Sequence, residues 1–198
     1  HKLIRSTDSV FEFTHHKIRE VIYENLESTL RRFYHLKTAS SLELGLAETV
    51  SNGYLAEIAH HYIEGDSLDK AFDYLVQLGE KASRIWANKE AIEYLSLALE
   101  ATKKYPNLAK SENLIKIYSI RGEAWRRVDW DVGAPEKAIN DHNSVLDAAI
   151  DLGDESLIAE AHYRLGRLYN PYFGEGDKKI HHNKIALELA RKKGNRLL

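Results

Sequence analysis

Three adjacent histidine pairs are the residues of this chain whose type first suggests metal chemistry: His15-His16, His60-His61 and His181-His182. Successive side chains on a helix point about 100° apart, so one ion cannot readily be held by both rings of such a pair. No H-E-x-x-H motif occurs, and no two histidines stand four residues apart beside a general-base glutamate. We therefore expect no metal site. We interpret His15 and His61 as hydrogen-bonded residues at a helix start or between helices.

A glycine-containing turn is the second candidate for chemistry. Gly174-Glu175-Gly176 precedes Asp177-Lys178-Lys179 and superficially suggests a phosphate-binding loop. A third glycine and a preceding strand are both missing, and the sequence contains no G-x-x-x-x-G-K-S/T motif. We expect an ordinary turn before a helix.

The segment 128–136 gathers several polar residues around one tryptophan. Asp129, Asp131 and Glu136 are explained by a solvated loop without any acid–base role. Trp130 lies in the same polar stretch and either tucks under the loop or forms an exposed contact. The arginine pairs Arg31-Arg32 and Arg126-Arg127 could bind anions, but exposed helix faces are the explanation that we favour. We therefore predict a protein that is not an enzyme and has no cofactor.

The overall composition is that of a soluble globular protein, with 43% hydrophobic and 29% charged residues among 198. The formal net charge of −2, with both signs interspersed, argues against direct nucleic-acid binding and against attraction to an anionic membrane. No cysteine is present, which excludes disulfides and permits a reducing compartment. We expect a cytoplasmic location. The first residues, HKLIRSTDSV, are neither a signal peptide nor a natural start, so we expect part of a longer protein.

The first third of the chain combines short strands with helices. The runs 2–6 and 9–13 are rich in β-forming residues and predict a hairpin, because Phe11 and Phe13 alternate with Glu12. Two amphipathic helices are expected next, over residues 15–26 and 29–43. Val21 and Ile22 lie on the apolar face of the first helix, and Leu30 and Phe33 are expected inside the second. The pattern breaks at 44–53. We therefore divide the chain into residues 1–45 and 46–198.

Small residues recur at helical intervals from residue 58 onward, which is typical of closely packed helical hairpins. The segment 68–86 carries a stripe of Ala71, Leu75, Leu78, Ala82 and Ile85, in steps of three and four. Later helices are predicted to begin near Asn88, Ser111, Pro135, Asp154 and Lys178.

Single residues punctuate these later helices. Asn88 and Asp154 are the expected N-caps, and Gly153 is the expected C-terminal stop. Gly122 lies within an apolar stripe, where glycine costs about 1 kcal/mol relative to alanine, so a close helix crossing is expected there.

Three segments resemble tetratricopeptide-type repeats, in which small residues on two helices flank an aromatic residue. The matching residues are Ala59, Tyr62 and Ala71; Gly122, Trp125 and Ala138; and Leu165, Gly166, Tyr169 and Ala186. The second connection is about four residues longer than the family's, and the third turn is also lengthened. The resemblance implies an all-α fold, a TPR-like α–α superhelix or solenoid, preceded here by the short β-hairpin.

The N-terminal third resembles the junction of STAND/AAA-type signal-transduction ATPases, in which a winged-helix-like module leads into helical repeats. The similarity rests on the pattern from Phe11 to Leu26, on Arg32 to Glu43, and on Ala59-x-His61-Tyr62. It implies that residues 1–45 derive from a winged helix and that the catalytic ATPase lies upstream.

The predicted function is that of a non-catalytic scaffold for protein–protein interaction within such a signalling protein. The repeat register places seven residues in a groove for a protein or peptide partner: Ser119, Glu123, Arg126, Arg127, Tyr163, Arg167 and Asn170. One alternative is an intramolecular sensor lid that controls the upstream ATPase. The other is a small-ligand sensor with a pocket between helices.

Overall fold

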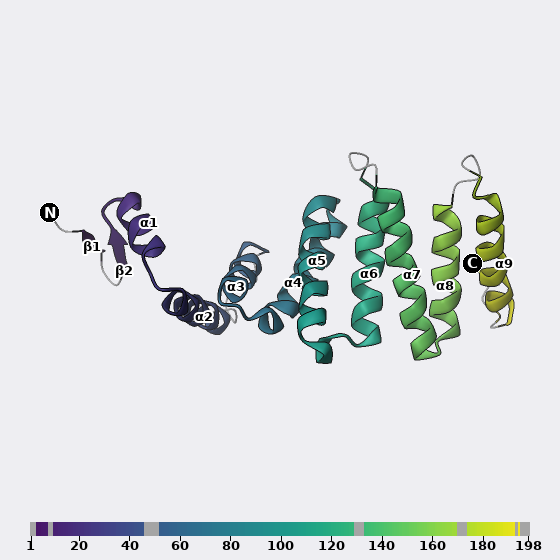
Figure 1. Cartoon of the computed structure of the whole chain (residues 1–198), viewed down its shortest axis with the longest axis horizontal. Helices are drawn as coiled ribbons and strands as arrows, with labels where there is room; N and C mark the ends of the chain where they lie inside the picture. Colours follow the sequence, from purple (N-terminus) through teal and green to yellow (C-terminus); the bar gives the residue numbers. More distant parts are fainter. Residues whose placement is uncertain are drawn as a thin grey trace. The chain divides into compact units, whose positions relative to one another are not determined.

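The computed structural model describes residues 3–7, 10–45, 52–128, 133–169, 174–192 and 194. Its elements follow one another as a β-hairpin and then a succession of helices (Figure 1). The described part of the chain forms an all-α, TPR-like fold with a two-stranded hairpin at its start, as the sequence predicts. It divides into two units, His1–Ser67 and Leu68–Leu198.

Unit 1 contains the hairpin and three helices. Strands β1 (Ile4–Thr7) and β2 (Val10–Phe13) are antiparallel, with Ile4 opposite Phe13. The helices are α1 (His16–Glu24), α2 (Ser28–Gly45) and α3 (Asn52–Glu64). The described strands and helices agree with the predicted order, and the helices end within two residues of the predicted limits.

The apolar faces of α1 and α2 are only partly covered. Leu30 and Phe33 were expected inside, but 40% and 50% of their surfaces are exposed. Helix α1 buries none of its residues. The buried part of unit 1 lies where α2 meets α3, around Ala39, Ile58 and Tyr62. The period of apolar residues thus predicted the helices correctly but not their burial.

Unit 2 is a succession of helices in which each one packs against the next along the chain. Its helices are α4 (Leu68–Arg84), α5 (Asn88–Lys104), α6 (Ser111–Arg126), α7 (Ala134–Leu152), α8 (Glu155–Leu168) and α9 (Gly176–Lys192), with a short 3₁₀ turn η1 (Pro106–Leu108). Leu75, Leu95 and Leu165 are fully buried along this series.

The helix ends of unit 2 confirm one pair of expectations and correct two others. Gly153 ends α7 in the left-handed conformation (φ 67°), and the Asp154 carboxylate accepts the amide hydrogens of Ser156 and Leu157 as N-cap of α8. Asn88 is not a cap: α5 begins after Ala87 without a side-chain cap. The stripe on α4 also ends early, since the chain turns after Arg84 and leaves Ile85 72% exposed.

None of the described helices combines the length and the apolar character needed to cross a membrane.

Candidate partner-binding groove

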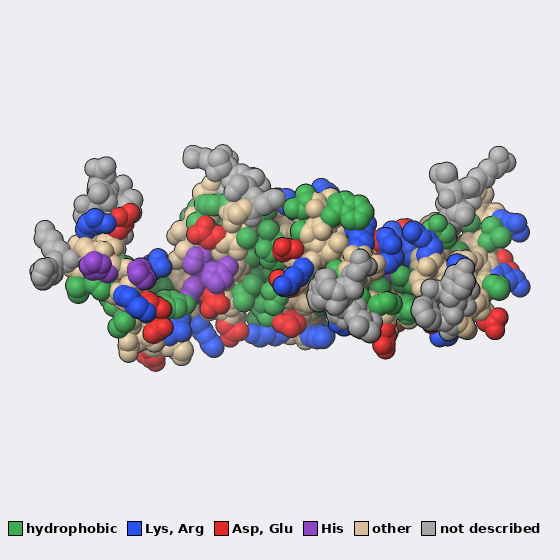
Figure 2. All heavy atoms as spheres, turned by 90° about the horizontal axis from the view of Figure 1, so that it is seen from above, with side chains coloured by type: hydrophobic (Ala, Val, Ile, Leu, Met, Phe, Trp, Pro, Cys, Tyr) green, Lys and Arg blue, Asp and Glu red, His purple; other side chains and the backbone are tan. Residues whose placement is uncertain are grey.

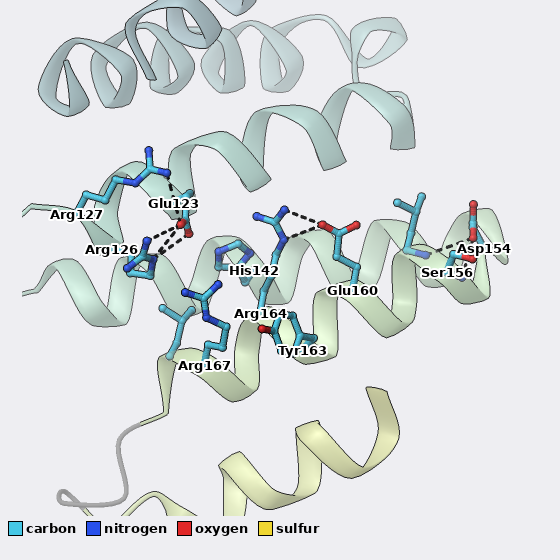
Figure 3. A pocket seen from close by; sticks show the side chains of 12 residues that line it. Glu123, Arg126, Arg127, His142, Asp154, Ser156, Glu160, Tyr163, Arg164 and Arg167 are labelled. Atoms are coloured by element: carbon cyan, nitrogen blue, oxygen red, sulfur yellow. Dashed lines mark hydrogen bonds and ion pairs between the residues drawn. The ribbon is translucent and has the colours of Figure 1, made fainter. Parts of the chain in front are cut away.

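A cavity of about 590 Å³ lies between α6, α7 and α8 in unit 2. Its volume falls within the range of about 300–1,000 Å³ that is typical of ligand-binding pockets. The wall on α6 carries Glu123, Arg126 and Arg127, and His142 comes from α7. Most of the remaining wall belongs to α8, whose exposed side chains point into the same space (Figure 3). Two first helices of successive hairpins thus supply most of the lining.

On α6, one carboxylate organises two arginines. Arg126 donates from Nε and Nη2 to Glu123, with the shortest distance 2.6 Å, and Nη2 of Arg127 lies 3.6 Å from the same carboxylate. The hydrogen bond from Arg126 lowers the pKa of Glu123, and the charges of Arg127 and Arg164 act in the same direction. The Arg127 guanidinium also stacks over the Trp86 ring, 4.4 Å from its centroid.

On α8, the charged residues fall at helical spacing. Arg164 donates to Glu160 one turn earlier, at 2.7 and 3.1 Å. Arg167 lies over the ring of Tyr163, 5.8 Å from its centroid, and has no ion pair among the described residues. The arginine cluster of the cavity consists of Arg126, Arg127, Arg164 and Arg167.

His142 forms the buried floor beside the arginine cluster. The residue is 1% exposed, and its Nδ1 atom has no hydrogen-bond partner among the described residues. Burial, reinforced by the charge of Arg164, lowers its pKa to about 4, so the imidazole is neutral near pH 7. A buried nitrogen without a partner is costly unless a ligand satisfies it.

Gly122 allows α6 to approach this histidine closely. A Cβ atom at position 122 would lie only 3.2 Å from Nε2 of His142 and 3.1 Å from Cβ of Asp141. The expected close helix crossing at this glycine is therefore confirmed.

An ion pair between Arg121 on α6 and the buried Asp141 on α7 holds these two helices together. Arg121 donates two hydrogen bonds to Asp141, at 2.6 and 2.9 Å, and a third to Ser96 on α5. Burial raises the pKa of Asp141, and the hydrogen bonds from Arg121 oppose that shift. The two-point contact orients α6 relative to α7.

Five of the seven residues predicted to face a groove line this cavity: Glu123, Arg126, Arg127, Tyr163 and Arg167. Ser119 is half-buried on α6 and lies outside the cavity wall. Asn170 lies outside the described residues.

The sequence reasoning missed three important members of the wall, His142, Glu160 and Arg164. The spacing of Glu160 and Arg164, four residues apart and next to Tyr163, was an available signal. His142 lies among buried apolar residues of α7, four residues after Ala138, and only the three-dimensional position of Gly122 reveals its neighbours.

In two of the three histidine pairs, one ring contacts a histidine on a neighbouring helix. His15 precedes α1 without a side-chain capping hydrogen bond, so the expectation of a hydrogen-bonded helix start is wrong for it. His61 and His35 approach at 2.8 Å between their Nδ1 atoms, and Tyr23 OH lies 2.8 Å from Nε2 of His35. His182 and His162 repeat this contact between α9 and α8 at 2.8 Å. The expectation that His61 bonds between helices is confirmed. In the part of the chain that the structure describes, no group of three or more potential ligands could hold a metal ion.

No protein-family model and no curated protein matches the sequence. Among solved structures, the chain is similar to the apo form of RapI, with a TM-score of 0.54 and 18% identity over 92% of this chain. It spans only 49% of that structure's chain. A second structure, MamA, has a TM-score of 0.46 and 15% identity, with 89% of this chain and 99% of MamA covered. The match to RapI supports the TPR-like fold, and the match to MamA is too distant to add to it.

Proposed function

We propose that this chain is a non-catalytic interaction segment that binds a protein partner through an extended, acidic stretch lying along α6 and α8. The observation that carries the proposal is the arginine cluster: four guanidinium groups from two successive hairpins share one open cavity. Surface exposure of such groups on a rigid helical scaffold favours recognition over structural support.

The chemistry of the wall supports an acidic ligand. In the part of the chain that the structure describes, Glu123 and Glu160 are the carboxylates that balance the arginines at this end, and Arg167 has no carboxylate partner there. Asp154, the other acidic group of the lining, is the N-cap of α8 and lies at the opposite end of the cavity (Figure 3). Guanidinium groups bind carboxylates and phosphates through paired hydrogen bonds, which gives both affinity and orientation.

Tyr163 adds an exposed aromatic ring to the arginine cluster. It is 38% exposed and lies beneath Arg167, so its ring is available to an incoming side chain. Tyrosine and arginine are the residue types that most often carry the energy of protein interfaces.

The proposal includes the wider setting that the sequence suggests, a cytoplasmic signalling ATPase with its catalytic domain upstream. In that setting the partner is either a separate protein or the ATPase itself. Comparing ATPase rates of the full-length protein with and without residues 46–198 separates the two. A changed rate supports the intramolecular lid, and an unchanged rate supports a docking scaffold.

The direct test uses the double substitution Arg126→Ala with Arg167→Ala. Peptides selected from a random displayed library on the wild-type chain are expected to bind the double variant at least about tenfold more weakly. Arg84→Ala is the matched control, because Arg84 is an exposed arginine of the same unit that pairs with Glu80 outside the cavity. Equal binding by the double variant would contradict the proposal.

A further inference from the structure

The arginine cluster carries more positive charge than its own carboxylates balance. Among the described residues at its end of the cavity, four guanidinium groups face two carboxylates, those of Glu123 and Glu160. Because Arg126 lowers the pKa of Glu123, that carboxylate stays ionised, and the excess among these described side chains is two positive charges. A carboxylate ligand would neutralise half of this excess, whereas a dianion would neutralise all of it.

Two nitrogen atoms of residues that line the cavity have no hydrogen-bond partner among the described residues. They are the Nδ1 atom of His142 and the Nε atom of Arg127, and both are buried. The histidine is almost completely buried, and Figure 3 places its ring between the guanidinium groups of Arg126 and Arg164. A neutral imidazole with its proton on Nδ1 can donate to an anionic oxygen. A ligand with several acceptor oxygens in a compact arrangement would satisfy these donor groups.

We propose that the cavity between α6 and α8 binds a phosphate monoester, carried as a phosphorylated side chain on the partner segment. That the phosphate is carried by a protein partner rests on the proposed function. The recognition of a phosphate dianion is argued from the cavity alone. A phosphorylated side chain brings close to two negative charges and three strong acceptor oxygens to one point. Arginine clusters recognise such groups through charge-assisted hydrogen bonds.

The geometry gives the four arginines different roles. Arg126 and Arg164 are held by Glu123 and Glu160 and form a preorganised frame on either side of His142. Arg167 has no such anchor among the described residues, and stacking on Tyr163 leaves its N–H groups available. Arg127 is held over the ring of Trp86. Basic side chains gather over this region of unit 2 on the face drawn in Figure 2.

The test uses the whole chain, labelled with ¹⁵N, and three probes at pH 8 and fixed low ionic strength. The probes are inorganic phosphate, the tripeptide Gly-phosphoserine-Gly and the tripeptide Gly-Glu-Gly. Dissociation constants come from chemical-shift titrations that follow the ring nitrogens of His142. We expect the phosphoserine peptide to bind about tenfold or more tightly than the glutamate peptide, and to move the His142 signals.

Variants assign the binding to the cavity. Arg167→Gln removes the charge but keeps a polar side chain, and it is expected to weaken phosphate and phosphopeptide binding about tenfold. Arg84→Gln, on α4, should leave both unchanged. Thermal unfolding of each variant confirms that the fold is retained.

The inference is overturned by equal affinity for the glutamate and phosphoserine peptides, by equal losses in Arg167→Gln and Arg84→Gln, or by binding that leaves the His142 signals unmoved. Binding of inorganic phosphate with exclusion of the phosphopeptide would also overturn it, because the carrier would then be a small molecule. If unphosphorylated library peptides bind the cavity while no phosphate does, the inference fails and the proposed function stands.

Discussion

The helices of units 1 and 2 have similar amphipathic patterns, yet their apolar side chains are buried to very different extents. In unit 1, Val21 on α1 and Phe33 on α2 keep about half of their surfaces exposed, at 54% and 50%. In unit 2, Leu75, Leu95 and Leu165 on three successive helices are completely buried. Apolar periodicity tells which residues share a helix face, but burial requires a second helix that can come close enough to cover it.

Small residues account for much of this difference. In unit 2 the leucines alternate with Gly79, Ala91, Ala138 and other small residues that are themselves buried against neighbouring helices. Helix α1 has no buried residue at all. Its neighbour in the chain, α2, packs on α3 through Ala39. The close approach of helices thus depends on the small residues and not on the apolar stripe alone.

The largest expected effect comes from opening a cavity in each unit in turn. Leu95→Ala in unit 2 should lower the free energy of unfolding by about 2–5 kcal/mol, because a fully buried side chain is removed. Phe33→Ala in unit 1 should cost about 1 kcal/mol or less, because half of the ring already contacts water. Urea denaturation followed by circular dichroism measures both. Equal losses would show that the two units are packed alike.

Acid should weaken unit 2 through His142. Its pKa is lowered to about 4 in the folded protein, so between pH 6.5 and 4 the unfolded chain binds a proton that the folded chain does not. Stability therefore falls as the pH falls through this window, by about 3 kcal/mol at most for this residue. His142→Gln should flatten the pH dependence by that amount, measured by urea denaturation at several pH values.

Burial also lowers the pKa values of His35 and His61 in unit 1 and of His162 and His182 in unit 2, so some acid sensitivity remains in every variant. An unchanged slope in His142→Gln would mean that this histidine is not buried as described.

The α8 cap gives a smaller effect. Asp154→Ala removes the acceptor for the amides of Ser156 and Leu157 and should destabilise unit 2 by about 1 kcal/mol. Asp154→Asn, which retains an acceptor oxygen, should cost clearly less. The two variants can be compared by thermal unfolding, and a loss as large in Asn as in Ala would rule out the hydrogen-bonded cap.

The smallest effect is expected from an exposed ion pair of unit 1. Lys17→Ala breaks its contact with Glu20, but both side chains are largely in water, so the stability change should stay within about 0.5 kcal/mol. A clearly larger loss on urea denaturation would indicate that α1 is held more firmly than its exposure suggests.

The sequence predicted most of the architecture, because the hairpin, the helix order and the stop at Gly153 are encoded locally. It also assigned Arg126 and Arg167 to one shared surface, and both line the same cavity, since register alone determines which side of a helix a residue occupies. That this surface binds a partner stays a prediction. The sequence-based prediction failed at the end of α4, where Ile85 continues the stripe in sequence although the helix has already turned. The sequence could not predict that His142 lines the cavity or that the apolar faces of unit 1 stay exposed. Both depend on contacts between segments far apart in the chain.

The central claim, that the arginine cluster on α6 and α8 is the binding surface of the chain, is tested most directly by one comparison of affinities. Peptides selected on the wild-type chain are titrated against wild type, the Arg126→Ala and Arg167→Ala double variant, and Arg84→Ala. The account predicts a loss of at least about tenfold in the double variant alone. Undiminished binding by the double variant, or an equal loss in Arg84→Ala, would contradict it.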